Sequence, residues 1–449
     1  MNIVEIIYKK KNNQALSKEE IDFFVQGYTE GKIEDYQMSA LLMAICINGM
    51  NDEEILNLTM SIVNSGDVMD LSSVNGVTVD KHSTGGVGDK TTLVVAPIVA
   101  ALGGKVVKMS GKGLGHTGGT TDKLESIEGF NTQLSQAELI NQVNEIGLCN
   151  VSQSGNLTPA DKKLYALRDV TGTVECTALI ASSVMSKKIA AGSDGIVLDV
   201  KMGSGAFMKD IEAARELAQK MVTIGKGAGK KVVALITNMD VPLGNTIGNS
   251  LEVKEAIEVL KGNGPKDLTE TCIELATYML NIGDGANCSK LNIGDTPDCQ
   301  NANKSKCRAM VEEVISNGKA LEKLKEMVRF QGGNVEVIDN PDLFKAPLYK
   351  KEILSLDSGY IKKMDAKLIG MVACNCGAGR TTKESSIDYT AGIVLNKKVG
   401  DYVEKGELLA TLYSSTVENF EAQEKDYHSA ITFSNDLPQL EPLIYEVIE

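Results

Sequence analysis

Two glycine-rich segments bring together the residue types that bind small anions. The first runs from Asp80 to Thr92 and reads DKHSTGGVGDKTT, and the second runs from Lys108 to Glu125 and reads KMSGKGLGHTGGTTDKLE. Glycine lets backbone N–H groups come close to a ligand, and neighbouring lysines and hydroxyls add further donors. Each segment lies beside an apolar run typical of a strand. Together they predict an active site that binds phosphate.

The first segment resembles a P-loop only superficially. A P-loop has glycine directly before its lysine, whereas Asp89 stands before Lys90 in this chain. A carboxylate at that place would repel the phosphates of a nucleotide. A glycine turn that merely opens a helix is the simpler alternative, but it leaves Lys81, His82 and Ser83 unexplained.

Two of the three histidines lie in these segments. His82 stands between Lys81 and Ser83, and its imidazole can share a proton near neutral pH. The pattern alone also allows a structural role for His82. For His116, the backbone of its glycine-rich loop is as good a candidate as the ring.

Two cations outside the glycine-rich segments are further candidates. Arg168 shares a predicted helix face with Leu164 and Tyr165. Lys187 follows Ser183 by one helical turn, so these two side chains project together. Charges on a solvated helix face are the simpler interpretation. A hydroxyl and two cations beside an apolar patch would suit the carbonyl groups of a planar base.

Composition excludes several classes of partner. The chain of 449 residues has a formal net charge of −14, no Trp and 4% aromatic residues, so we expect no nucleic acid partner. No apolar run reaches the ~18 residues of a membrane span, so we expect no membrane association. The nine cysteines are scattered and indicate a reducing, cytoplasmic setting. Cys374 and Cys376 lack a nearby His or second pair and are not expected to bind a metal.

Hydrophobic periodicity indicates an α/β protein with additional helices. Helical spacing, with capping boxes beginning at Ser17 and Asn51, predicts short helices over the first 65 residues. After Val77, short β-branched runs alternate with helical segments, which predicts a mixed, mainly parallel sheet covered by helices. Strands are expected at 77–79, 105–109, 149–152, 196–201 and 232–237, and helices at 91–103, 136–147, 209–225 and 251–261.

A second helical stretch interrupts this alternation. Thr158 is the expected N-cap of a helix that has Pro159 at its first position and ends near Arg168. Another helix is expected over 176–191. If these helices pack on the N-terminal ones, they form a small discontinuous all-α domain.

Three domains follow from these patterns. The all-α domain would comprise 1–65 and 159–193, and the large α/β domain 75–154 and 194–340. Residues 345–449 are glycine-rich and predict a β-rich α+β subdomain packed on the α/β domain. Hinges are expected at about 66–79, 154–158 and 192–195. The polar stretch 283–310 is expected to be a surface loop.

Several long motifs, in the same order, resemble the pyrimidine-nucleoside phosphorylase and thymidine phosphorylase family. The matching segments are 80–89, 110–120 with Asp122 and Glu125, 157–169 and 182–191. The resemblance covers nearly the whole chain, more loosely at 283–340 and at the C-terminus. It implies a cleft between the α and α/β domains and a homodimer formed through the α domain.

The resemblance also implies the residues of the site. Phosphate would be bound by Lys81, Ser83, Thr92, Lys108, Ser110 and Thr120. The pyrimidine would be bound by Tyr165, Arg168, Ser183 and Lys187. Catalysis would fall to His82, acting on O2 of the base, and to Arg168 and Lys187. Some family members bind a monovalent cation, K⁺, at positions that match Gly88, Lys90, Leu243, Thr246 and Glu255. No organic cofactor is expected.

The implied reaction is reversible phosphorolysis of uridine, deoxyuridine and thymidine, assisted by domain closure. Lys108 favours the broad-specificity branch, since thymidine-restricted members tend to have Met there. The family's usual arginine is replaced by Lys112, which keeps the charge and loses the planar fork. The alternatives are a thymidine-restricted phosphorylase, a non-catalytic nucleoside sensor, and a fold-related phosphoribosyltransferase, which would need a divalent metal and an acidic diphosphate motif.

Overall fold

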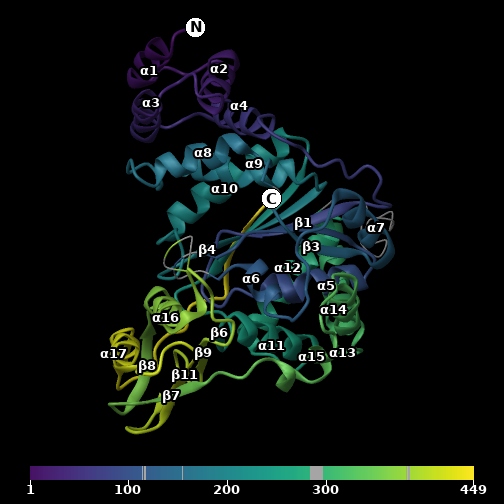
Figure 1. The fold of residues 1–449 in the computed structure, drawn as a ribbon, viewed down its shortest axis with the longest axis vertical. Helices are drawn as coiled ribbons and strands as arrows, with labels where there is room; N and C mark the ends of the chain where they lie inside the picture. Colours follow the sequence, from purple (N-terminus) through teal and green to yellow (C-terminus); the bar gives the residue numbers. More distant parts are fainter. Residues whose placement is uncertain (114, 116–117, 154, 284–296, 381, 383–384) are drawn as a thin grey trace.

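The computed structural model describes residues 1–113, 115, 118–153, 155–283, 297–380, 382 and 385–449. Figure 1 shows helices of the N-terminal region at one end, a central sheet with its covering helices in the middle, and a β-rich C-terminal part beside the α/β region. This arrangement confirms the predicted fold class: a helical part, a large α/β part with a mainly parallel sheet, and a β-rich C-terminal part. Within the described residues, no helix has the length and apolar character to span a bilayer.

Six helices form the helical part. They are α1 (Ile3–Lys11), α2 (Lys18–Thr29), α3 (Asp35–Asn48), α4 (Asp52–Val63), α8 (Pro159–Arg168) and α9 (Thr177–Ala190). Both predicted capping boxes are present, from Ser17 to Glu20 and from Asn51 to Glu54. Helix α9 packs on α4, and α8 packs on α2, so the two later helices join the N-terminal ones.

Thr158 is the N-cap residue of α8 and Pro159 is its first residue, as predicted, but Thr158 does not cap the helix in the usual way. Thr158 precedes the helix in a left-handed conformation, φ 47° and ψ 57°, and its side chain makes no capping bond. Instead, the Ala160 amide donates to Oγ of Ser65, at 3.2 Å. The chain crosses itself closely here, because a Cβ at Gly66 would lie 2.3 Å from Cδ of Pro159. The cap therefore comes from a residue distant in sequence.

A six-stranded sheet in the order β13-β5-β4-β1-β2-β3 is the centre of the α/β part. Its strands are β1 (Thr78–Ser83), β2 (Lys105–Ser110), β3 (Leu148–Ser152), β4 (Gly195–Met202), β5 (Lys231–Asn238) and β13 (Ile444–Ile448). The first five run parallel, and β13 pairs antiparallel with β5. Both glycine-rich segments leave the carboxyl ends of neighbouring strands, β1 and β2, where open α/β sheets bind ligands.

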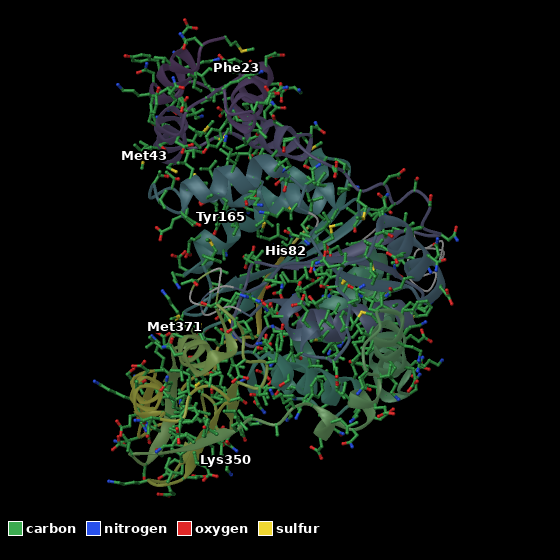
Figure 2. The ribbon with its side chains drawn as sticks, in the orientation of Figure 1. Phe23, Met43, His82, Tyr165, Lys350 and Met371 are labelled. Atoms are coloured by element: carbon green, nitrogen blue, oxygen red, sulfur yellow. The ribbon has the colours of Figure 1, made fainter. Side chains whose placement is uncertain are left out.

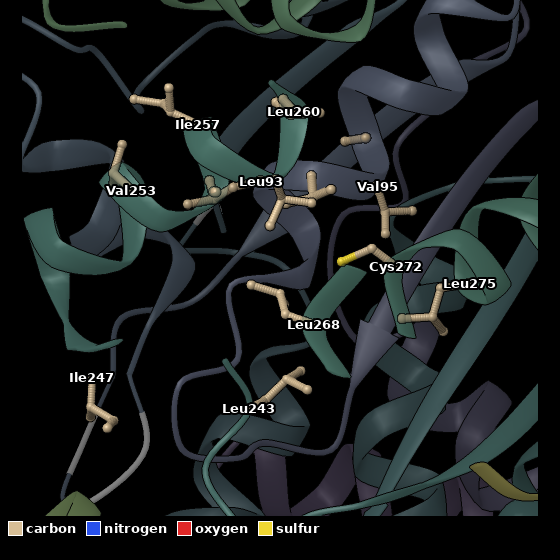
Figure 3. Packing of buried hydrophobic residues seen from close by; sticks show 14 of the residues in the cluster. Leu93, Val95, Leu243, Ile247, Val253, Ile257, Leu260, Leu268, Cys272 and Leu275 are labelled. Atoms are coloured by element: carbon tan, nitrogen blue, oxygen red, sulfur yellow. The ribbon is translucent and has the colours of Figure 1, made fainter. Parts of the chain in front are cut away.

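The two faces of the sheet belong to different cores. Alternate residues such as Val79 and Val197 face one core, while Leu198 and Val200 face the other, as the period of a strand requires. The first core includes α5 (Thr91–Ala101), α11 (Asn249–Leu260) and α12 (Lys266–Ile282), and Figure 3 shows Leu93 of α5 among apolar side chains of α11 and α12. The second core lies against α10 (Ile211–Gly227) and the helical part. Residues near β1 are thus held between two packed layers.

Further helices complete the α/β part. They are α6 (Thr120–Glu125), α7 (Gln136–Ile146), α13 (Pro297–Ser316), α14 (Lys319–Phe330) and α15 (Glu336–Asp339). The expectation of a surface loop over 283–310 is wrong for residues 297–310, which belong to α13. Val311, Val314 and Ile315 near the end of α13 are buried, and the helix packs on α12. Tertiary packing thus stabilises a helix whose first half is polar.

The C-terminal part is joined to the α/β part by two strand pairings. Its elements are β7 (Tyr349–Leu354), β8 (Gly359–Met364), α16 (Ala366–Ala373), β9 (Gly392–Leu395), β10 (Tyr402–Val403), β11 (Leu408–Ser414), α17 (Glu421–Ser429) and β12 (Ile431–Ser434). Strand β6 (Thr246–Gly248) of the α/β part pairs with β9, and β13 returns to pair with β5. Cys374 and Cys376 are buried, and burial raises the pKa of Cys376 to about 12, so this thiol stays protonated.

Candidate active site

Lys81 lies at the centre of a buried cluster of charges at the end of β1. Its Nζ is 3.1 Å from Oδ2 of Asp199 and 3.7 Å from Oδ1 of Asp89, and it donates to Oγ1 of Thr91 at 2.5 Å. Burial opposes the charge, but the fields of Asp89 and Asp199 outweigh it and raise the pKa of Lys81. Lys81 is therefore an ammonium that is fixed in place.

Strand β4 supplies two charged residues that we did not predict. Nζ of Lys201 is 2.8 Å from Oδ2 of Asp199, and Oγ1 of Thr237 donates to Oδ1 of Asp199 at 2.5 Å. Asp199 and Lys201 are fully buried. Alternating charges inside the otherwise apolar strand VLDVKM were the available signal, because such groups are rarely buried without a partner. Lys201 and Thr237 thus hold the Asp199 carboxylate, which binds Lys81, in place.

A second group of charges surrounds Asp80. Nζ of Lys108 is 3.2 Å from Oδ1 of Asp80 and donates to the main-chain oxygen of Lys81 at 2.6 Å. Nζ of Lys188, on α9, is 2.9 Å from Oδ2 of Asp80. Burial lowers the pKa of Lys108 to about 7; Asp80 opposes this shift, and the positive charges of Lys188 and Lys81 add to it. Lys108 can thus change its charge near neutral pH.

The predicted phosphate-binding hydroxyls lie at the ends of strands and at the starts of helices. Ser83 ends β1, Ser110 ends β2, Thr92 lies in the first turn of α5 and Thr120 begins α6. Ser110 Oγ is buried and has no hydrogen-bond partner among the described residues, so it is free to bind a ligand. The N-terminus of α5 adds a favourable dipole for an anion.

His82 is half-buried at the end of β1. Burial lowers the pKa of its imidazole well below the usual value, and the positive charges of Lys188, Lys108, Lys81 and Lys187 lower it further. The imidazole is therefore neutral at pH 7, and one ring nitrogen carries a hydrogen to donate. Figure 2 shows His82 on the sheet, with Tyr165 of α8 between it and the N-terminal helices.

Helices α8 and α9 bring Lys187 and Ser183 together, as their spacing predicted. Lys187 Nζ is 3.1 Å from Ser183 Oγ. It also forms an ion pair with Asp161 of α8, a residue that we did not predict. Because Lys188 is bound to Asp80 on β1, the end of α9 is anchored to the sheet. The positive charge of Lys187 also contributes to the lowered pKa of His82.

Arg168 is placed differently from the other predicted residues. It is 2% exposed, and its guanidinium donates to the main-chain oxygens of Thr173, Val174 and Leu179, at 3.1, 2.7 and 3.2 Å. These bonds hold the connection between α8 and α9. The ring of Tyr165, which is 37% exposed, lies 5.6 Å from Cζ of Arg168. The structure thus turns Arg168 toward main-chain carbonyls and leaves Tyr165 accessible.

The second glycine-rich segment is held by an arginine from the C-terminal part. Arg380 binds both carboxylate oxygens of Asp122, at 2.9 and 2.8 Å, and its main-chain oxygen accepts from the Gly115 amide. The Gly113 amide also donates to Asp122, at 2.7 Å. Arg380 thus makes a bidentate contact of a kind that the ammonium of Lys112 cannot make. Lys112 is exposed, and its Nζ lies 3.3 Å from Oε2 of Glu125. His116 lies outside the described residues.

The five positions of the expected cation site do gather around one point, where Nζ of Lys90 stands. This nitrogen donates to the main-chain oxygens of Leu243 and Thr246, at 3.0 and 2.8 Å, and forms an ion pair with Glu255. Gly88 packs on the same carbonyls, because a Cβ there would lie 2.5 Å from the Leu243 oxygen. A separate K⁺ would have to share these oxygens with a buried ammonium. The residues present therefore do not fit a bound cation.

Family models match most of the chain. The helical bundle domain of the glycosyl transferase family matches residues 4–66, and the a/b domain of that family matches residues 75–321. The pyrimidine nucleoside phosphorylase C-terminal domain matches residues 360–434. The chain therefore belongs to this class of glycosyl transferases.

Curated relatives narrow the class. The pyrimidine-nucleoside phosphorylase of Staphylococcus haemolyticus is 55% identical over 415 residues, covering 92% of both chains. That of Geobacillus stearothermophilus is 50% identical over 448 residues, covering 100% of both. Anthranilate phosphoribosyltransferase from Thermus thermophilus shares the fold alone, with a TM-score of 0.54 and 17% identity over 73% of this chain and 99% of that one. The chain belongs to the pyrimidine-nucleoside phosphorylase family of enzymes.

Proposed function

We propose that this enzyme catalyses the reversible phosphorolysis of pyrimidine nucleosides. Inorganic phosphate would displace the base at C1′ with inversion, giving the free base and α-D-ribose or 2-deoxyribose 1-phosphate. The observation that best supports this proposal is the anchoring of α9 on β1 through Lys188 and Asp80. It brings the pair of Ser183 and Lys187 within electrostatic reach of His82, beside the predicted phosphate residues.

Phosphate would bind at the carboxyl ends of β1 and β2. Lys81 is a fixed ammonium, and the buried hydroxyl of Ser110 has no other described partner. The other ligands we propose are Ser83, Thr92, Lys108 and Thr120. Phosphate is a modest nucleophile, so these groups serve mainly to position it, and holding two reactants in line can lower a barrier by roughly 7–11 kcal/mol.

The pyrimidine would bind against α8 and α9, with Tyr165, Arg168, Ser183 and Lys187 around it. As the C1′–N1 bond breaks, the sugar develops oxocarbenium character and the base takes up negative charge. Lys187 would stabilise this charge electrostatically, and the neutral imidazole of His82 would donate a hydrogen bond to O2. Arg168 has five N–H donors, and the bonds to its three carbonyl partners leave donors that we propose for the base.

Domain closure would bring the phosphate site on β1 and β2 and the base site on α8 and α9 together. One predicted hinge position, Ser154, lies outside the described residues. We further propose a cytoplasmic homodimer formed through the helical part and acting without an organic cofactor. Exposed apolar side chains on α3 support this dimer surface: Tyr36 is 72% exposed and Ile47 is 74% exposed, and Met43 lies at the outer side of the same helix (Figure 2).

One assay tests the proposal against its rivals. Uridine is incubated with and without phosphate, with no added Mg²⁺, and the release of uracil is followed by absorbance. We expect release only with phosphate. A phosphoribosyltransferase would instead require diphosphate chemistry and Mg²⁺, and a sensor would bind uridine without releasing uracil.

Substrate breadth is tested with the same assay. We propose that Lys108 allows ribosides as well as deoxyribosides, because an ammonium can contact a 2′-hydroxyl. Lys108→Met should then lower kcat/KM for uridine more than for thymidine. An equal loss for both substrates would contradict broad specificity through Lys108.

A further inference from the structure

We propose that the ammonium of Lys90 is a built-in replacement for a monovalent metal ion, and that this enzyme works without K⁺. The inference goes beyond the proposed reaction, since it concerns what holds the first glycine-rich segment in place. Lys90 is 1% exposed, so its charge is removed from solvent and must be satisfied by protein groups.

The surroundings of Lys90 have the composition of a cation site. A lysine ammonium has three N–H donors. Three close acceptors meet it here: the main-chain oxygens of Leu243 and Thr246 and a carboxylate oxygen of Glu255. Oγ1 of Thr246 lies further away, at 3.3 Å. Carbonyl, hydroxyl and carboxylate oxygens are the ligands that hard cations take in proteins.

The oxygens of Leu243, Thr246 and Glu255 form a cage around the Lys90 ammonium. The charges within this cage already balance. One ammonium faces one carboxylate, and Glu255 is further held by the amide of Asn245, at 2.8 Å. A metal ion added to the same oxygens would leave a buried positive charge without a partner, which is strongly unfavourable. The wall is also tight, because a Cβ at Gly244 would lie 3.0 Å from Nζ of Lys90.

The cage connects the first glycine-rich segment to two other elements. Lys90 immediately precedes α5, whose first turn carries Thr91, the partner of Lys81, and Thr92. Its acceptors lie on the segment after β5, which contains Leu243 and runs into β6, and on α11, which carries Glu255. Lys90 is therefore a positioning residue. It fixes the start of α5 and is not itself one of the residues proposed to bind phosphate.

The wild-type protein gives the first test. The protein is freed of K⁺ and studied in KCl or choline chloride at equal ionic strength, by thermal unfolding and by the KM for phosphate. We expect the same Tm and the same KM in both salts. A Tm that rises with K⁺ in a saturable way, or a KM that falls with it, would overturn the proposal. The Tm reports on the cage even if the proposed reaction is wrong.

Substitution of Lys90 gives the second test. Lys90→Ser removes the ammonium and leaves the oxygens, so in choline chloride we expect a lower Tm and a KM for phosphate raised by about tenfold or more, as for other supporting residues of a binding site. K⁺ should restore both values, and Li⁺ should not. A variant as stable as wild type in choline chloride, or one with no K⁺-specific recovery, would count against the proposal.

A matched control is available in the helical part. Lys10 and Glu54 form an ion pair at 2.8 Å, and each side chain is 3% exposed, but among the described residues no main-chain carbonyl accepts from the Lys10 ammonium. Lys10→Ser should lower Tm without any recovery in K⁺. Equal recovery of both variants would show a general salt effect and refute a specific cation cage. If Lys90→Ser does not fold, the milder Lys90→Gln is measured in its place by the same criteria.

Discussion

Lys188 of α9 binds Asp80 of β1 with 2.9 Å between Nζ and Oδ2, and the two side chains are only 3% and 1% exposed. This ion pair joins the helical part to the strand that carries Lys81 and His82. Lys187, the neighbour of Lys188, is thereby held near His82. The pair is therefore a structural link between the two parts, and we propose that it aligns the base-binding residues of α9 with the phosphate-binding residues of the sheet.

Removing one partner of this pair should be costly. Lys188→Met leaves Asp80 buried with Lys108 as its remaining partner, and breaking a buried pair typically costs about 3–5 kcal/mol. We expect a loss of that order in the free energy of unfolding, measured with urea. Lys220→Met is the control, since Lys220 and Glu216 form a more exposed pair at 3.6 Å that should contribute about 1 kcal/mol or less. Equal losses in the two variants would refute a role for the buried link.

Lys108 should make stability depend on pH above neutrality. Its pKa is about 7 in the folded protein, against the ordinary value of 10.5. Between these values the unfolded chain binds a proton that the folded protein does not, so stability rises with pH. Wild type should therefore gain more unfolding free energy between pH 7 and pH 9 than Lys108→Met does. A wild-type gain equal to or smaller than that of the variant would show that Lys108 is charged throughout this range.

His82 should stay neutral through the physiological range. Its pKa is lowered well below 6.5 by burial and by four nearby lysines. In a spectrum of histidine-labelled protein, the resonance that is missing from His82→Gln should not titrate between pH 8 and pH 6. A titration midpoint at or above 6.5 would contradict the proposed role as a neutral hydrogen-bond donor. Three histidines in the whole chain make this assignment practicable.

Arg380 should control phosphate binding from a distance. Its fork binds both oxygens of Asp122, which in turn binds the Gly113 amide in the second glycine-rich segment. Arg380→Lys cannot keep both contacts. A small misplacement of binding groups can cost up to about 10²-fold. We expect the KM for phosphate to rise by about tenfold or more, with little change in the KM for uridine.

The control for this variant is Arg308→Lys. Arg308 forms ion pairs with Glu270, Glu274 and Glu312 on α12 and α13, outside the glycine-rich segments. The Arg308→Lys variant loses a similar set of contacts and should leave the KM values for phosphate and uridine unchanged. A rise in both KM values for Arg380→Lys would indicate general damage to the fold.

Local patterns predicted much of the framework. The parallel strands, the capping boxes and the pairing of Ser183 with Lys187 follow from periods of two to four residues, which the sequence displays directly. The placement of Lys81 and Ser110 at strand ends follows from the same reasoning.

Tertiary partners could not be predicted in this way. Arg380 lies 258 residues from Asp122 in the chain, and Ser65 accepts from the Ala160 amide, 95 residues away, at the start of α8. Strand β13 joins the central sheet from the C-terminus. No local period records such pairings, because they depend on how separate elements pack. The main-chain partners of Arg168 are of the same kind, because the carbonyls it binds come together only once α8 and α9 meet.

The central claim, that phosphate and base bind on separate elements, is tested most directly by a matched pair of serine variants. Ser110 ends β2 and has no described side-chain partner, whereas Ser183 lies on α9 beside Lys187. Initial rates should give a raised KM for phosphate with Ser110→Ala and a raised KM for uridine with Ser183→Ala. If both variants instead raise the KM of the same substrate, or raise both KM values equally, the division of the site between the two elements is wrong.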